Sequence, residues 1–304
     1  MSDLDLDSIL AFAIKLAHEA GEMMRQGQAK RFIEATGEVE KLNSVDLVTE
    51  VDKAVEAFIT NKIKQTYPDH EFIGEETYVG QKVTGAPTWI VDPIDGTTNF
   101  IHGFPMSCTS IGLAVNEVPV LGVIYNPFLD ELYSAAKGRG AYLNQKIKLP
   151  LTGTPKPLAS LGQALIGIEF GSTRMPPAIT AKNKTYETLS KHRDVGGKMV
   201  HSLRATGSAA LNACYIATGG LDIYWEIGPW PWDTCAAICI ITEAGGAVFG
   251  GKDSGLSGKV DAKVFAERKW VFVRAMPDTE GETGFQAQQR FAKEFYETVE
   301  EWDP

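Results

Sequence analysis

The sequence of 304 residues predicts a mixed fold of the α+β or α/β class in two abutting halves. Three observations predict it: helical spacing of apolar residues over the first 66 positions, short β-branched and aromatic runs from 71 to 135, and alternating strand and helix patterns beyond residue 160. Hydrophobic residues make up 44% of the chain and charged residues 22%, as in ordinary globular proteins. This composition excludes a disordered tail protein, a collagen-like repeat and a small disulfide scaffold.

The first half is expected to open with two amphipathic helices and to continue as a sheet. Apolar residues recur every three or four positions over 4–26 and 47–66, and Pro68 ends the second helix. The later runs are bounded by Gly, Pro and Asn, which predicts a largely antiparallel sheet. Its strands are expected at 71–73, 88–91, 107–115, 119–125 and 131–135. Turn-forming residues over 148–157 place the boundary between halves of 1–150 and 151–304.

The second half is expected to alternate strands and helices. Two apolar helices begin at Ser208 and Asp233, and glycine pairs at 219–220 and 245–246 close them. The tail at 276–304 combines an acidic linker with a polar helix, and its role does not follow from the sequence. The other expected elements are strands at 164–168, 221–225, 247–249 and 270–273 and helices at 183–191 and 285–302.

The net charge of −10 comes from 39 acidic and 29 basic residues. Proteins that bind nucleic acid are more often basic, so no nucleic-acid partner is expected. The chain starts with acidic residues instead of a basic leader, and no apolar run reaches membrane-spanning length. We therefore expect a cytoplasmic protein with no membrane partner. Cys235 and Cys239 lie one helical turn apart in an apolar stretch, which favours buried thiols over zinc ligands.

The run WIVDPIDGTTNF at 89–100 carries the chemistry. A strand leads into Asp92, and Pro93 is expected to stop it. Asp92 and Asp95 then place two carboxylates three residues apart at the strand end. Such a pair suits a hard divalent cation such as Mg²⁺, which takes oxygen ligands and leaves positions for water or substrate.

Two interpretations of this run stand side by side. Backbone N–H groups near Gly96 and Thr97 could hold phosphate oxygens, as the start of a helix does. The same run could be a simple turn, because Asp, Pro and Gly dominate turns. Taken one at a time, three further acids also have purely structural explanations: Glu75 as a loop residue, Asp52 in a capping box and Asp233 as a helix N-cap. Those explanations leave the joint occurrence of all these acids in one chain unaccounted for.

The combination resembles the inositol monophosphatase family of Mg²⁺-dependent, lithium-sensitive phosphatases. The resemblance covers residues 5–250 and rests first on the run WIVDPIDGTTNFIHGFP at 89–105. Its partner motifs are 46–52, 72–76, 207–210, 217–220, Glu226 and Trp232-Asp233. The resemblance implies an αβαβα layered sandwich, as in the inositol monophosphatase and fructose-1,6-bisphosphatase type of sugar phosphatase. It also implies hydrolysis of a phosphate monoester and, usually, a homodimer.

The resemblance further implies a role for individual residues. Two to three Mg²⁺ ions per subunit are implied, with Li⁺ as an inhibitor. Their ligands would be Glu75, Asp92, the backbone carbonyl of Ile94, Asp95 and Asp233. Thr97 and Asp52 would orient and deprotonate the attacking water, and Glu75 counts with them as catalytic. The groups that hold the substrate would be Asp95, Gly96, Thr97, the backbone of Ala209, and Glu226.

This ligand set is chemically coherent, because phosphoryl transfer to water depends mainly on positioning and on neutralising charge. The expected substrate is myo-inositol 1-phosphate, since Glu226 and Asp233, seven residues apart, favour a polyol ring. One alternative is the same chemistry on 3′-phosphoadenosine 5′-phosphate, histidinol phosphate or a sugar phosphate. Another is a catalytically silent regulatory homologue, which would predict a broken ligand set. Lys41 falls in a loop that can fold over the site in relatives, but the sequence favours a solvated surface lysine at this position.

Overall fold

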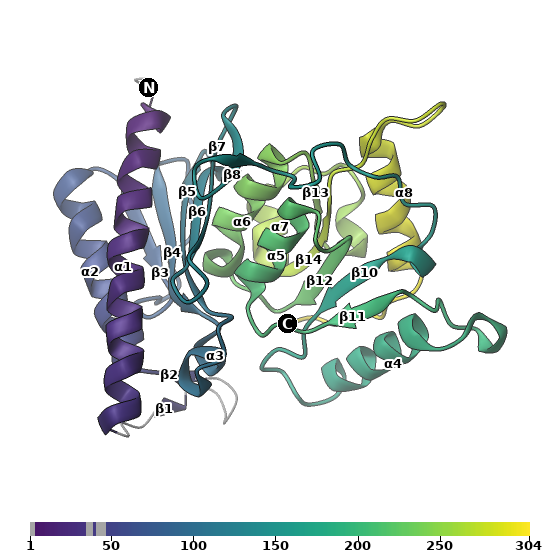
Figure 1. Cartoon of the computed structure of the whole chain (residues 1–304), viewed down its shortest axis with the longest axis horizontal. Helices are drawn as coiled ribbons and strands as arrows, with labels where there is room; N and C mark the ends of the chain where they lie inside the picture. Colours follow the sequence, from purple (N-terminus) through teal and green to yellow (C-terminus); the bar gives the residue numbers. More distant parts are fainter. Residues whose placement is uncertain (1–3, 35–38, 41–46) are drawn as a thin grey trace.

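The computed structural model describes residues 4–34, 39–40 and 47–304. Across them the chain forms five layers in the order helix, sheet, helix, sheet, helix (Figure 1). Three separate groups of buried apolar side chains fill the spaces between successive layers. The expected αβαβα sandwich is therefore confirmed. No helix in the described part is long and apolar enough to cross a membrane.

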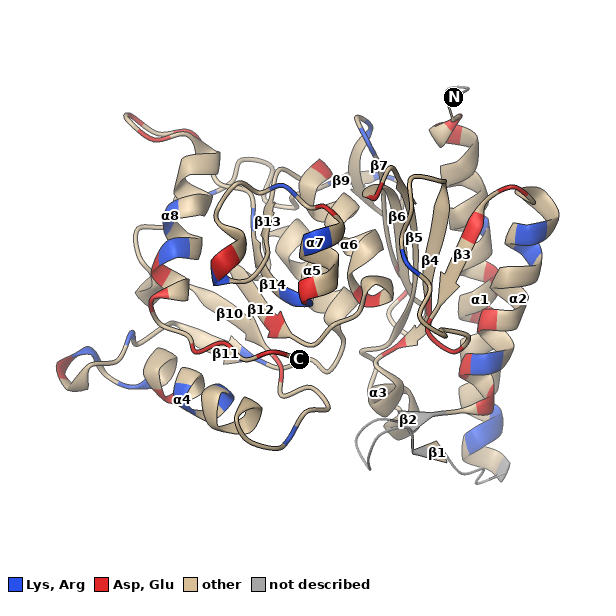
Figure 2. Ribbon diagram, turned by 180° about the vertical axis from the view of Figure 1, so that it is seen from behind, with Lys and Arg blue, Asp and Glu red and all other residues tan. Residues whose placement is uncertain are grey.

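Helices α1 (Leu6–Glu34) and α2 (Glu50–Thr66) form the first layer and bury one face against the larger sheet. Both signs of charge are distributed along their outer faces (Figure 2). The helix expected at 4–26 continues to Glu34, because tertiary contacts hold its polar end: Gln28 Nε2 donates to the carbonyl of Phe100 at 2.7 Å. α2 begins with the expected capping box between Thr49 and Asp52.

The larger sheet has seven strands in the order β3-β4-β5-β6-β7-β8-β9, and only the β3–β4 pair is parallel. Parallel strands end at the same edge, so the segments that follow β3 and β4 lie side by side. The strands are β3 (Glu71–Gly74), β4 (Thr88–Asp95), β5 (Cys108–Val115), β6 (Val118–Asn126), β7 (Glu131–Ala136), β8 (Gly140–Leu143) and β9 (Ile147–Lys148). A separate two-stranded sheet joins β1 (Val39–Glu40) to β2 (Leu47–Val48).

The expectation that Pro93 stops β4 is wrong, because the strand continues to Asp95. The pairing of β4 with β5 is regular up to Asp92 and then shifts register before Asp95. An irregularity of this kind tolerates a proline, which has no N–H to donate to the ladder. The short helix α3 (Thr97–His102) follows directly after Gly96.

The middle layer consists of α5 (Ala209–Thr218) and α6 (Pro231–Glu243), both packed between the two sheets. Close approach of α6 requires glycine in the sheet: a Cβ at Gly122 would lie 2.1 Å from the carbonyl oxygen of Ala236. Asp233 is not the N-cap expected from the sequence; Trp230 holds that position, and Asp233 stands three residues further on. All four cysteines are buried and free, as expected for Cys235 and Cys239.

The smaller sheet has the order β11-β10-β12-β14-β13 and is covered on its outer face by α4 (Ala178–Ser190) and α8 (Gly284–Tyr296). Its strands are β10 (Leu165–Ile168), β11 (Ser202–Arg204), β12 (Ile223–Ile227), β13 (Ala247–Phe249) and β14 (Lys269–Val273). The short helix α7 (Ala262–Glu267) precedes β14. α4 starts five residues before the expected position 183, and α8 ends at Tyr296 instead of residue 302, after which the chain turns back over α4.

Candidate active site

Three carboxylates meet where the ends of the sheets face the middle helices. One oxygen from each of Asp92, Asp95 and Asp233 lies within 4.8 Å of the other two. In a regular strand, residues three apart point to opposite faces, so Asp92 and Asp95 would diverge. The register shift between them allows both carboxylates to reach the same side, while the first turn of α6 supplies Asp233.

Burial and mutual repulsion make this cluster costly without a cation. Burial raises the pKa of Asp92 well above its usual range, and the carboxylates of Glu75, Asp95 and Asp233 add to that effect. The pKa of Asp233 rises for the same reasons, burial first and then Asp95 and Glu75. A set of carboxylate oxygens is the donor chemistry that Mg²⁺ takes in proteins. The residues therefore fit a divalent cation.

Glu75 adjoins the cluster from the end of β3. Its backbone N–H donates to the carbonyl of Val91 at 3.2 Å, and its side chain is partly exposed. Glu56, buried on α2, holds the turn around it by accepting a hydrogen bond from the N–H of Glu76 at 2.7 Å. A side chain at Gly74 would meet the Glu56 carboxyl carbon at 2.5 Å, so only glycine allows this approach.

Asp95 is held by the start of α5. Its Oδ2 accepts the hydroxyl of Ser208 and, at 2.8 Å, the N–H of Ala210. Burial raises the pKa of Asp95, and these hydrogen bonds oppose the rise. These bonds fix the carboxylate that contributes one oxygen to the cluster. Ala209 is the first residue of α5, so its backbone lies beside Asp95.

A second group pairs Thr97 with Asp52. The Thr97 hydroxyl lies 3.1 Å from Asp52 Oδ1 and 3.0 Å from the carbonyl oxygen of Ile94. Asp52 Oδ2 accepts both the hydroxyl and, at 2.9 Å, the N–H of Thr49. Burial raises the pKa of Asp52 to about 6 against the effect of these hydrogen bonds. Asp52 is thus both part of a capping box and a carboxylate that can exchange a proton near neutral pH.

Gly96 fixes the turn between these two groups. Its φ is +82°, and an added Cβ would lie 2.8 Å from the carbonyl oxygen of Met106 and 3.2 Å from that of Gly207. Both observations require glycine. Lys41 lies outside the described residues.

Glu226 on β12 marks the other end of the site. Tyr224 donates its hydroxyl proton to Glu226 Oε2, and Glu226 as a whole residue is half-buried. Burial raises the pKa of Glu226 well above its usual range, and Glu169, Asp233 and Asp95 contribute through their negative charges. Glu226, which the sequence predicts to hold the substrate, is therefore close enough to the acidic cluster for their charges to interact.

Sequence reasoning missed three residues that support the site: Glu56, Glu169 and Ser208. Glu169 Oε1 accepts the N–H groups of Thr206 at 2.6 Å and Gly207 at 2.8 Å, which fixes the loop before α5. Ser208 was detectable as the cap of a predicted helix. Glu56 was detectable as a charge on the apolar stripe of α2, whereas nothing local marks Glu169.

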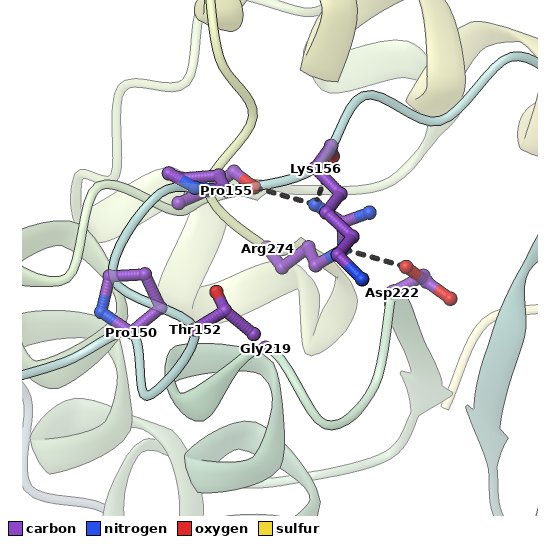
Figure 3. Close-up of a pocket in the computed structure, with 8 residues that line it drawn as sticks. Pro150, Thr152, Pro155, Lys156, Gly219, Asp222 and Arg274 are labelled. Atoms are coloured by element: carbon purple, nitrogen blue, oxygen red, sulfur yellow. Dashed lines mark hydrogen bonds and ion pairs between the residues drawn. The ribbon is translucent and has the colours of Figure 1, made fainter.

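A hollow of about 230 Å³ lies elsewhere, lined in part by Pro150, Gly219 and Arg274 (Figure 3). Arg274 donates to Asp222 Oδ1 at 2.6 Å and to the carbonyl of Lys156 at 2.7 Å. None of the predicted site residues lines this hollow. It is therefore separate from the candidate active site.

Comparisons with known proteins show which family shares this sequence and fold. The model of the inositol monophosphatase family matches residues 5–283. Inositol monophosphatase 2 of Saccharomyces cerevisiae is 50% identical over 215 residues, 70% of this chain and 72% of that protein. Quinic acid degradation cluster protein x of Neurospora crassa is 37% identical, covering 98% of this chain and 96% of its own. The Thermotoga maritima IMPase structure matches with a TM-score of 0.73 at 27% identity, covering 96% of each chain. The chain belongs to the inositol monophosphatase family of metal-dependent phosphatases.

Proposed function

We propose that this phosphatase hydrolyses myo-inositol 1-phosphate to myo-inositol and phosphate, with two to three Mg²⁺ ions as cofactor. The observation that carries the proposal is the position of the Thr97–Asp52 pair, which the carbonyl of Ile94 joins to the strand bearing Asp92 and Asp95. A water-activating pair and a metal-binding cluster thus share one strand end.

The metal ions would be held by Glu75, Asp92, the carbonyl of Ile94, Asp95 and Asp233. When bound, they supply positive charge for the phosphate and lower the pKa of the attacking water. Thr97 orients that water: Thr97 Oγ1 takes its proton while the Thr97 hydroxyl proton passes to Asp52 Oδ1. The backbone N–H groups of Gly96 and Thr97 contribute to phosphate binding at the same turn. The water oxygen then bonds to phosphorus as the bond from phosphorus to the ester oxygen breaks, and the released oxygen takes a proton from solvent water to become the inositol hydroxyl.

The ring of the substrate would be held by Asp95, the backbone of Ala209, and Glu226. Carboxylates accept hydrogen bonds from hydroxyl groups, so they suit a polyol. Glu226 and Glu169 would repel a ring that carries its own carboxylate. That repulsion favours inositol over quinic acid, the compound in the name of the Neurospora crassa relative.

Phosphate release by purified protein from a panel of phosphomonoesters tests the proposal. We expect turnover of inositol 1-phosphate that requires Mg²⁺, stops with a chelator and is inhibited by Li⁺. Faster turnover of an adenosine bisphosphate, histidinol phosphate or a sugar phosphate would overturn the substrate. No turnover of any ester would overturn the catalytic role itself.

A homodimer in the cytoplasm completes the proposal. Four free, buried cysteines suit a reducing compartment, in which disulfides are rare. One chain has a mass of 33.1 kDa, and light scattering of the purified protein should give twice that mass. A mass of one chain at assay concentration would contradict the dimer.

A further inference from the structure

We propose that Lys182, covered by Trp302 of the C-terminal segment, is a positioning residue that shapes the polyol end of the active site. The inference rests on the proposed function, because it concerns how the ring of the substrate is held. Neither residue belongs to the predicted ligand set, and Trp302 lies beyond residue 283, where the match to the family model ends.

Lys182 is a buried lysine, with 1% of its surface exposed. Its ammonium group donates to the carbonyl of Phe170 and, at 3.2 Å, to that of Thr173. The same nitrogen lies 5.0 Å from the centre of the Trp302 ring, a favourable cation–π distance. Two carbonyls and one aromatic face therefore compensate the ammonium for its lost water. The two carbonyls belong to the loop after β10, so Lys182 closes that loop.

This loop lies directly against Glu226. A Cβ built on Gly171 would be 3.4 Å from Glu226 Oε1 and 3.5 Å from Lys182 Nζ, so the loop at Gly171 passes close to both groups. Burial lowers the pKa of Lys182, and the negative charge of Glu226 opposes the change. The ammonium is therefore a cation beside Glu226, where Glu169 adds further negative charge; Arg174 of the same loop donates to the carbonyl of Gly171 at 2.7 Å.

Ring and ion-pair contacts hold the C-terminal segment, residues 297–304, over Lys182. Trp302 is 6% exposed and packs edge-on against Trp225, at 5.8 Å between ring centres, on the residue before Glu226. Ion pairs join Lys184 of α4 to Glu300 and, at 2.8 Å, Lys269 of β14 to Asp303. The chain end accordingly lies beside the smaller sheet (Figure 1).

Removing the ammonium would leave two loop carbonyls without their donor and would take one cation away from Glu226. The loop and Glu226 would then shift, which weakens contacts with ring hydroxyls. The metal cluster and the Thr97–Asp52 pair would remain. We therefore expect a higher KM for inositol 1-phosphate, about tenfold as for a lost charge-assisted hydrogen bond, with little change in kcat. An ester without ring hydroxyls, p-nitrophenyl phosphate, should keep its KM.

Steady-state kinetics on both esters at saturating Mg²⁺, with melting temperatures, tests this for Lys182→Met and Trp302→Ala. Trp302→Phe keeps an aromatic face and loses no hydrogen bond, because the buried indole nitrogen has no partner among the described residues; it should restore the wild-type KM. Lys191→Met, at a partly exposed lysine that pairs with Glu187 at the end of α4, is the matched control and should change neither KM.

The outcomes separate the inference from the function on which it rests. A KM for inositol 1-phosphate that is unchanged in both Lys182→Met and Trp302→Ala would overturn the inference and leave the function intact. An equal rise in KM for both esters would also overturn it, since that indicates general damage. A wild-type protein that fails to hydrolyse inositol 1-phosphate would overturn the proposed function first. If Lys182→Met does not fold, Trp302→Ala decides.

Discussion

The hydroxyl of Thr97 meets Asp52 Oδ1 at 3.1 Å, although 45 positions separate the two residues. Thr97 is the first residue of α3 and Asp52 the third of α2, so the contact joins two helix starts. Asp52 is 1% exposed and is held on its other oxygen by Thr49. These contacts hold the pair in a position to orient one water molecule. The hydroxyl of Thr97 is therefore the first group to test.

Replacing Thr97 by alanine should slow the chemical step without disturbing metal binding. General base catalysis typically contributes 10²–10⁴-fold, so we expect kcat to fall by about that factor. Thr97→Ser should recover much of the rate, because it keeps the hydroxyl. The exposed neighbour Thr98 supplies the control Thr98→Ala. Mg²⁺ affinity, measured by calorimetry, should match the wild type in all three; a normal rate for Thr97→Ala would remove Thr97 from the mechanism.

The acid side of the pH profile should report Asp52. Because burial raises the pKa of Asp52 to about 6, the base is ionised above that pH and protonated below it. We expect kcat/KM to rise with pH through about 6 and then level off. Protons also compete with Mg²⁺ for the carboxylate cluster, so profiles are needed at two saturating Mg²⁺ concentrations. An inflection that moves with Mg²⁺ concentration would show that metal loss, not Asp52, sets the acid limb.

Much of this fold and site could be predicted because local pattern and long-range structure agree there. Apolar runs such as 88–91 and 119–125 lie inside the observed strands β4 and β6. The glycine pair at 219–220 ends α5 as expected, with Gly219 in the left-handed conformation. The Asp-Pro-Ile-Asp run carries its chemistry in consecutive residues. Asp92 and Asp95 could therefore be named together before their geometry was known.

The remaining features depend on contacts between distant segments. Nothing near Glu169 shows that its carboxylate holds the N–H groups of Thr206 and Gly207, 37 and 38 positions away. Strands β8, β9 and β11 are two to four residues long, too short for a periodic pattern. α8 ends at Tyr296, and Trp302 packs on Trp225 beyond it, a contact between distant segments that helical periodicity does not predict.

The metal-free protein should become more stable when one cluster acid is neutralised. The pKa of buried Asp92 is raised, so the folded state binds its proton more tightly than the unfolded state. Stability is then lost as pH rises above the unfolded value, and the loss is present at neutral pH. Asp92→Asn removes that charge and keeps an acceptor for the N–H of Ile94. In chelator at neutral pH we expect its Tm to rise by 2–4 °C, about 1 kcal/mol.

Adding Mg²⁺ should reverse this difference, so that the wild type melts at a higher temperature than Asp92→Asn. Binding stabilises the wild type by mass action, whereas Asp92→Asn should respond weakly and have no measurable phosphatase activity. Asp253→Asn, at an exposed position, controls for the loss of one negative charge and should leave both Tm and its Mg²⁺ response unchanged. Calorimetric scans with and without Mg²⁺ give the comparison. A lower Tm for metal-free Asp92→Asn would contradict the view that the cluster is destabilising without its cation.

Gly96 offers a test of the turn that joins the metal cluster to Thr97. Its φ of +82° disfavours any Cβ, and a methyl group there would lie 2.8 Å from the carbonyl oxygen of Met106. Gly138 has nearly the same φ, +77°, but an added Cβ would meet nothing within 4 Å. Gly96→Ala and Gly138→Ala therefore share the backbone penalty and differ in the clash.

Because the turn must move to relieve that clash, Gly96→Ala should displace Thr97 from Asp52 and lower kcat at least tenfold. A misplacement of about 1 Å far from the chemistry can cost 10²-fold. Gly138→Ala should lose stability of about 1 kcal/mol from its strained φ and keep the wild-type kcat. Kinetics and Tm on the two variants separate strain from misplacement. Equal kcat values would mean that the turn at Gly96 does not position the catalytic hydroxyl.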